Sequence, residues 1–342
     1  MNKVRQMNLA VGGGRINYLD ALKCLGILLV VEGHVWDFGM GIETYDSLSG
    51  LMLYTFNMPI FFFASGFLAL AYKVKLELSD TIKKIRQKFI YLVIPAIIFY
   101  IFRQLQGCGN PLNILTMGFG GYWFTITLFE CFFIYYLTAL VLPNNKLQDV
   151  VLIGLGILGI AFLSVVGEYG PKLLDLNRLA KYFQFFVMGI LAMKYKGSFD
   201  RIMRNEILKA VSLLSFFALL FVINYEMWPR PVFHLLRDIV LRYLGTFVVV
   251  SWFVCHAECF NAESKFNRLV LNIGKKSLAI YLLQYFFIPD FTSYKSWLEG
   301  MDGFTVHVIS FAYTIVIVAT CYVFISLLSN SSLIKKYVLG QK

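Results

Sequence analysis

Apolar segments recur along the whole 342-residue chain and are separated by short polar loops. Ten of them are long enough to cross a bilayer as helices, for which about 20 apolar residues are needed. Their expected limits are 18–37, 50–72, 88–104, 121–142, 148–167, 178–195, 206–225, 235–257, 273–289 and 304–328. The pattern predicts an all-α polytopic membrane protein with about ten transmembrane helices.

The polar segments are too short to fold as separate soluble domains. We therefore expect a single transmembrane domain over residues 1–342, with a polar N-terminal tail at 1–17 and a C-terminal tail at 329–342. Lysine and arginine gather in alternate loops, chiefly 73–88 and 194–206. By the positive-inside rule, both termini are predicted to lie in the cytoplasm.

Composition agrees with this class and excludes others. The chain is 58% hydrophobic, above the share of about 45–50% found in soluble domains. Its net charge of +11 is concentrated in the loops, so the positive-inside rule explains it and no nucleic-acid partner is expected. The six cysteines form no CxxC pair, and neither a metal site nor a disulfide framework is expected.

The first apolar segment carries four ionisable residues, Asp20, Lys23, Glu32 and His34. Charged groups are costly in a membrane, so these should face the protein interior or a wet cavity. Lys23 and His34 are eleven residues apart, which returns to within about 20° of the same helical face, roughly 16 Å further along the axis. Asp20 falls near that face, whereas Glu32 points away and is expected to serve packing or fold specificity.

His34 is the strongest candidate for chemistry, because a histidine acts as a general base near neutral pH. The alternative is a polar histidine bonded to a loop at the membrane interface. Lys23 has an alternative too, since a lysine near a helix end extends its charge to the surface at little cost. Asp20, three residues earlier, is then only its ion-pair partner.

The loop between the second and third predicted helices is strongly basic. Its charges are either topogenic or form a phosphate-binding rim at the cytoplasmic surface. The residues of this predicted rim are Lys73, Lys75, Lys84, Arg86 and Lys88.

Prolines and small residues predict irregular or close-packed helices. Pro95 removes a backbone donor and should kink the third predicted helix. The second contains Pro59 and the triplet Ala64, Ser65 and Gly66, which favours a bend and close helix contact. Trp123 opens the fourth predicted helix, where an aromatic-belt position is the simplest interpretation.

Several segments together resemble the acyltransferase 3 family of bacterial membrane O-acyltransferases. LDALKCLGILLVVEGH is similar to the family's first helix, whose signature is a basic residue, ten intervening residues and a histidine, here Lys23 and His34. FNMPIFFFASGFLA is similar to its second-helix motif. Further similar segments are YWFTITLFE, YFQFFVMGIL and IGKKSLAIYLLQ. The match covers most of the chain, in a form without an appended soluble domain.

Two positions depart from the family pattern. Lys23 stands where arginine is common, which loses a bidentate fork for phosphate or carboxylate. Gln284 stands where similar proteins often have a histidine, so a second catalytic histidine is not expected there.

The resemblance implies an O-acetyltransferase of the bacterial cytoplasmic (inner) membrane. Acetyl-CoA would be the acyl donor, with its phosphates at the basic rim and its pantetheine arm passing Lys23; a succinyl or longer acyl donor is the alternative. A sugar or glycan hydroxyl would be the acceptor. His34 would activate that hydroxyl, and Asp20 or another buried carboxylate would orient the charged groups. Candidate oxyanion donors are Ser65, Trp123 and backbone amides beside Pro59.

Two other classes of function are consistent with a polytopic membrane protein. Broken helices and buried charges also occur in transporters, but no inverted repeat is visible in the sequence. A non-enzymatic membrane scaffold would not require the costly Lys23 and His34. The sequence specifies neither the acceptor sugar nor the oligomeric state.

Overall fold

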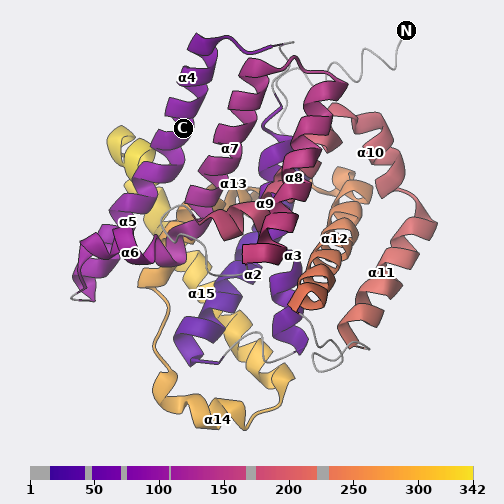
Figure 1. Ribbon diagram of the computed structural model, residues 1–342. Helices are drawn as coiled ribbons and strands as arrows, with labels where there is room; N and C mark the ends of the chain where they lie inside the picture. The colour runs from indigo at the N-terminus through magenta and orange to yellow at the C-terminus, as the bar shows by residue number, and fades with distance from the viewer. Residues whose placement is uncertain are drawn as a thin grey trace.

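The computed structural model describes residues 16–42, 48–70, 75–107, 109–166, 175–221 and 231–341. This part of the chain is helical and contains no strand (Figure 1). Its α-helices are α2 (Asn17–His34), α3 (Leu48–Phe67), α4 (Leu78–Lys88), α5 (Ile94–Gln106), α6 (Ile114–Met117), α7 (Trp123–Val141), α8 (Lys146–Val166), α9 (Leu176–Lys194), α10 (Lys196–Met203), α11 (Glu206–Phe221), α12 (Pro231–Cys255), α13 (Lys265–Leu283), α14 (Lys295–Glu299) and α15 (Gly303–Leu328).

The predicted segments coincide with these helices, and the segment 88–104 falls on a π-helical turn, Phe89–Val93, and α5. The all-α class is confirmed. Five helical spans among the described residues are long and apolar enough to cross a membrane: Leu78–Gln106, Gly120–Val141, Lys146–Ser164, Leu235–Cys255 and Gly303–Leu328. The full set of ten spans and the cytoplasmic position of the termini stay predictions.

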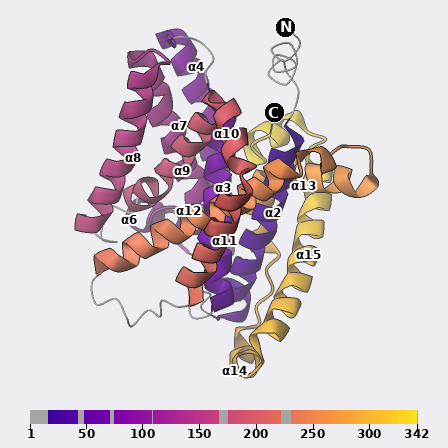
Figure 2. The ribbon, with the colours of Figure 1, turned by 90° about the vertical axis from the view of Figure 1, so that its right-hand side faces the viewer.

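Helices α2 and α3 lie at the centre of the bundle (Figure 1). Helix α2 packs against α3, α13 and α15, and α3 packs against α9 and α12. Figure 2 shows α15 alongside α2, with α7 and α8 on the other side of the molecule. The helix that carries the ionisable residues is therefore enclosed by protein, as the cost of charge in lipid requires.

Two helix contacts depend on glycine. A Cβ atom on Gly66 of α3 would lie 1.9 Å from the carbonyl oxygen of Phe186, and one on Gly189 of α9 would lie 2.1 Å from that of Phe63. The backbones of α3 and α9 thus meet without space for a side chain. The predicted close contact at Gly66 is confirmed.

A glycine also allows a close backbone contact between α2 and α13. A Cβ atom on Gly274 would lie 1.8 Å from the carbonyl oxygen of Asp20. Helix α13 is also fixed at its start, where the Ser264 side chain accepts a hydrogen bond from the Asn267 backbone N–H. The lysines and tyrosines that follow Gly274 are consequently held against α2.

Prolines affect two helices differently. A π-helical turn at Phe89–Val93 lies between α4 and α5, and Pro95 follows it in the first turn of α5. The kink expected at Pro95 stays a prediction. Helix α3 stays one helix around Pro59. A second π-helical turn, Val35–Met40, directly follows His34.

We predict that Gly274→Ala destabilises the protein by about 1–3 kcal/mol, since the added methyl group forces α13 away from α2. Thermal unfolding in detergent should show a Tm lower by several degrees. Gly154→Ala on α8 is the matched control, because no atom lies within 4 Å of its Cβ position. Equal Tm values for the two variants would contradict the proposed contact.

Candidate functional site

One face of α2 borders a cavity of about 550 Å³. Lys23, Ile27 and Val30 line it, and their spacing of four and then three residues defines one stripe of the helix. His34 lies four residues beyond Val30 and continues this stripe, roughly 6 Å further along the axis. His34 itself is not part of the cavity lining. Lys23 and His34 therefore share a face, with the cavity beginning at Lys23 and ending short of His34.

The cavity lining is strongly basic. Five lysines line it and no acidic residue does: Lys23 on α2, Lys88 on α4, Lys275 and Lys276 on α13, and Lys335 after α15. The rest of the lining is largely apolar, with Phe124, Leu128 and Phe132 contributed by α7. Several lysines facing one space attract an elongated ligand that is anionic at one end and apolar or neutral along its length.

The segment after α15 closes one side of the cavity. Lys335, Gly340 and Gln341 line it, although they belong to the expected C-terminal tail. Gly340 has a φ of +61°, and its Cβ position lies 2.3 Å from the carbonyl oxygen of Tyr91, so only glycine fits there. Leu339 is fully buried. Residues 334–341 are thus a packed wall of the cavity.

His34 lies in a box of aromatic rings beyond the inner end of the cavity. Its ring centroid is 4.9 Å from that of Tyr285 and 5.4 Å from that of Phe38. The Tyr285 hydroxyl oxygen lies 3.3 Å from His34 Nε2. Gln284 is fully buried and its side chain lies beside the imidazole. The position where the family often has a histidine is therefore next to His34.

Hydrogen bonding assigns the proton on the neutral imidazole. The Tyr285 hydroxyl donates its one proton to the Gly121 carbonyl oxygen at 2.9 Å, so the Tyr285 oxygen accepts from Nε2–H of His34. The lone pair of His34 is then on Nδ1. The described residues form no well-aligned hydrogen bond to this buried nitrogen, although the Gln284 side chain lies close enough to interact with the imidazole. His34 Nδ1 is accordingly the atom placed to take a proton.

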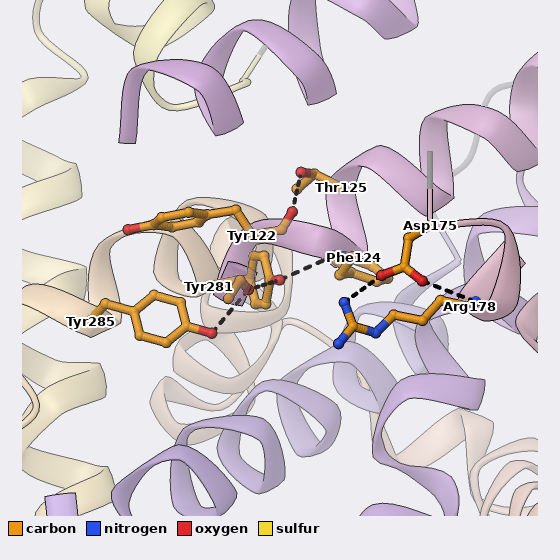
Figure 3. Close-up of polar contacts among 8 residues, drawn as sticks. Tyr122, Phe124, Thr125, Asp175, Arg178, Tyr281 and Tyr285 are labelled. Carbon is orange, nitrogen blue, oxygen red and sulfur yellow. Dashed lines mark hydrogen bonds and ion pairs between the residues drawn. The ribbon is translucent and has the colours of Figure 1, made fainter. Parts of the chain in front are cut away.

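The Gly121 carbonyl oxygen lies between the Tyr281 and Tyr285 hydroxyls, and Figure 3 shows these two tyrosines. The carbonyl oxygen accepts hydrogen bonds from Tyr285 and also from Tyr281, and Tyr281 lines the cavity. The Tyr281 hydroxyl in turn accepts from the Phe124 backbone N–H at 3.3 Å. A fixed row of Tyr281, Gly121 and Tyr285 therefore separates the cavity from the imidazole.

Arg103, in the last turn of α5, lies on the same rings as His34. Its guanidinium carbon is 4.4 Å from the Tyr285 ring centroid and 5.5 Å from that of Phe38. The two rings pack edge to face, with centroids 5.7 Å apart. A guanidinium and an imidazole thus share one aromatic box at the end of the α2 stripe.

The remaining predicted residues of α2 have other contacts. Asp20 accepts from Lys23, whose Nζ lies 2.7 Å from Asp20 Oδ1. It is about 21 Å along the helix from His34, so its direct contact is with Lys23, and its expected role in orienting the charged groups stays a prediction. Glu32 Oε1 lies 3.0 Å from His307 Nδ1 and 3.2 Å from Ser310 Oγ, both on α15. Glu32 therefore does link helices, as expected for a packing residue.

The predicted basic rim is only partly at the cavity. Lys88 lines it, with Nζ 3.5 Å from the Phe132 ring centroid. Lys84 lies one turn away over Tyr136, whereas Lys75 and Arg86 are exposed outside the lining. Helical periodicity explains this, because only every third or fourth position of α4 faces α7. Lys73 lies outside the described residues.

Neither side chain proposed as an oxyanion donor contacts the His34 box. Ser65 lines the cavity on α3. Trp123 stacks on Tyr182, with ring centroids 5.4 Å apart. The guanidinium carbon of Arg178 lies 4.5 Å from the Trp123 ring centroid. Both side chains therefore pack in surroundings other than the aromatic box around His34.

Sequence reasoning missed Lys275, Lys276, Lys335, Arg103 and Tyr285. A signal existed for the first two, since adjacent lysines inside an apolar run are costly unless they face a polar space. Lys335, Arg103 and Tyr285 reach the site only through tertiary packing, which local spacing does not reveal.

Comparison with protein families identifies the class. The family model of the acyltransferase 3 family, described as an acyltransferase domain, matches residues 16–326, nearly the whole chain. The chain belongs to this family of membrane acyltransferases. The comparisons with curated proteins and with solved structures gave no significant match.

We predict that the double variant Lys275→Gln/Lys335→Gln binds 3′,5′-ADP at least about ten-fold more weakly, because charge-assisted contacts to phosphate are lost. Calorimetry on purified protein measures this affinity. Arg86→Gln is the matched control, since it removes an exposed charge outside the cavity. An equal loss in both proteins would show that overall charge, not the cavity, attracts the anion.

Proposed function

We propose that the protein is an acyl-CoA-dependent membrane O-acyltransferase, which transfers acetyl from cytoplasmic acetyl-CoA to a hydroxyl of a cell-surface or lipid-linked sugar. The single observation that carries the proposal is the lysine-lined cavity that runs along α2 from Lys23 toward His34 and ends short of it. Acetyl-CoA has phosphates at one end and a thioester at the other, which suits a lysine-lined cavity that runs toward His34. Membership of the acyltransferase 3 family supports the reaction class. The proposed location is the cytoplasmic membrane of a bacterium.

In this proposal the donor is held by both ends of the cavity. The phosphates contact the lysines of α4, α13 and the segment after α15, and the pantetheine arm lies along Ile27 and Val30. The volume of about 550 Å³ falls within the range of roughly 300–1,000 Å³ usual for ligand pockets. The eleven residues from Lys23 to His34 span roughly 16 Å, comparable to the length of the pantetheine arm.

The thioester must pass Tyr281 to reach His34. Since Tyr281 lines the cavity and is bonded to Gly121, its side chain has to move before the acyl group enters the aromatic box. Closing the site in this way keeps water from the thioester until the donor is bound. The described arrangement corresponds to the closed state in this proposal.

The chemistry then follows from His34 Nδ1. This nitrogen takes the proton of the acceptor hydroxyl while the hydroxyl oxygen bonds to the thioester carbonyl carbon. The carbonyl electron pair moves to oxygen, and the tetrahedral intermediate collapses as the C–S bond breaks. The proton on His34 passes to the departing thiolate, which leaves as CoA. Tyr285, by accepting from Nε2–H, keeps the imidazole in the tautomer that this step needs.

We predict that His34→Ala lowers kcat for acetyl transfer by about 10²–10⁴-fold, the usual contribution of a general base. The measurement is transfer of radiolabelled acetyl from acetyl-CoA to a cell-envelope glycan extract by purified protein in lipid. His256→Ala is the matched control, because His256 is exposed and stacks on Trp252. The control should keep wild-type activity.

A folded His34→Ala protein with full activity would refute the role of His34. Wild-type protein that neither binds nor turns over acyl-CoA would refute the proposed reaction. Movement of a sugar or lipid intermediate across vesicles by such a protein would instead support a transporter.

A further inference from the structure

Arg103 is distinguished from the other described arginines near the bundle centre by its surroundings. Arg178 and Arg237 form ion pairs with Asp175 and Asp238, and Arg242 donates to the Tyr54 carbonyl oxygen at 3.0 Å. For Arg103, within the described ranges, the contacts are instead with the faces of Tyr285 and Phe38. Its charge is thus held by aromatic rings, a contact that leaves N–H donors available to an anion.

Arg103 and His34 are held against the same two rings. Tyr285 has His34 at 4.9 Å and Arg103 at 4.4 Å, and Phe38 has them at 5.4 Å and 5.5 Å. Packing on these rings therefore positions the guanidinium and the imidazole, and the Tyr285 hydroxyl in addition hydrogen-bonds to His34. Asp37, the carboxylate in the adjoining turn, accepts a hydrogen bond from Tyr54. A base and a cation thus contact the same pair of rings.

We propose that Arg103 is a catalytic residue that binds the negative charge formed on the thioester carbonyl oxygen during acyl transfer; this inference rests on the proposed function. As the acceptor oxygen bonds to the carbonyl carbon and gives its proton to His34, the carbonyl electron pair becomes an oxyanion that accepts hydrogen bonds from the guanidinium. When the C–S bond breaks, that pair reforms the carbonyl and the thiolate takes the proton from His34. Acetyl-CoA and the sugar hydroxyl supply all reacting atoms.

The position of Arg103 suits this role better than the donors expected from sequence. Ser65 faces the donor cavity, and Trp123 packs on Tyr182 and under Arg178. A cation beside a developing oxyanion stabilises it, and Arg103 lies on the same two rings as His34.

The test compares Arg103→Gln and Arg103→Lys with wild-type protein. We measure kcat and KM for acetyl-CoA and for the glycan acceptor, and acetyl-CoA hydrolysis without acceptor. The expected result for Arg103→Gln is a kcat lower by about 10²–10³-fold for transfer and hydrolysis alike, the cost of removing one oxyanion donor. The KM for acetyl-CoA should stay within about three-fold, and Arg103→Lys should recover part of kcat because it keeps the charge.

Arg178→Gln is the matched control, since Arg178 also lies on an aromatic ring, at 4.5 Å, but is paired with Asp175. Its kcat should stay near that of wild type. A wild-type kcat for Arg103→Gln would overturn the inference. So would a raised acceptor KM with unchanged hydrolysis, which would make Arg103 an acceptor anchor.

Folding and activity are separated by the second variant. If Arg103→Gln fails to fold, a folded Arg103→Lys protein with a reduced kcat supports the inference, and one with a wild-type kcat overturns it. Wild-type protein without transfer or hydrolysis refutes the proposed function itself. Active wild-type protein with an equally active Arg103→Gln refutes only the inference about Arg103.

Discussion

The close contact between α2 and α13 at Gly274 is the constraint on which the site depends. Because a Cβ atom there would lie 1.8 Å from the Asp20 carbonyl oxygen, the two backbones lie as near as helices can. Helix α2 carries Lys23 and the stripe to His34, and α13 carries Lys275, Lys276 and Tyr281. The same contact therefore sets the width of the cavity and brings the turn after α13, with Gln284 and Tyr285, beside His34.

The ionisable residues of α2 illustrate how a helix inside this bundle tolerates charge. Asp20 and Lys23 pair with each other where the cavity begins, and Glu32 pairs with His307 and Ser310 of α15. Each charge thus has a polar partner within the protein, which lowers the cost of burial. His34, in contrast, is surrounded by rings and keeps one nitrogen without a well-aligned hydrogen bond in the described part of the chain. A buried nitrogen without a hydrogen bond costs stability, and a functional role for His34 would explain why it is present.

Sequence periodicity predicted the helices well because long apolar segments in a bilayer have to satisfy their backbone hydrogen bonds internally. It also put Lys23 and His34 on one face, since both lie on the single helix α2. It assigned the whole basic loop to one rim, although only Lys88 of its described residues lines the cavity. Arg103, Tyr285 and Lys335 reach the site from α5, the turn after α13 and the segment after α15. Their proximity depends on how distant helices pack, for which neither spacing nor propensity carries information. The identity of the acceptor sugar stays a proposal.

The most direct test of a donor path along α2 is a cryo-EM structure of the protein in lipid with a non-hydrolysable acetyl-CoA analogue. We expect the phosphates beside Lys275 and Lys335. The carbonyl carbon of the acyl group should lie within about 4 Å of the acceptor position next to His34 Nδ1. This separation is close to the near-attack distance of roughly 3–3.5 Å. We also expect that the Tyr281 side chain has moved from the Gly121 carbonyl. An analogue bound outside the lysine-lined cavity, or one inside it with its acyl end directed away from His34, would contradict the account.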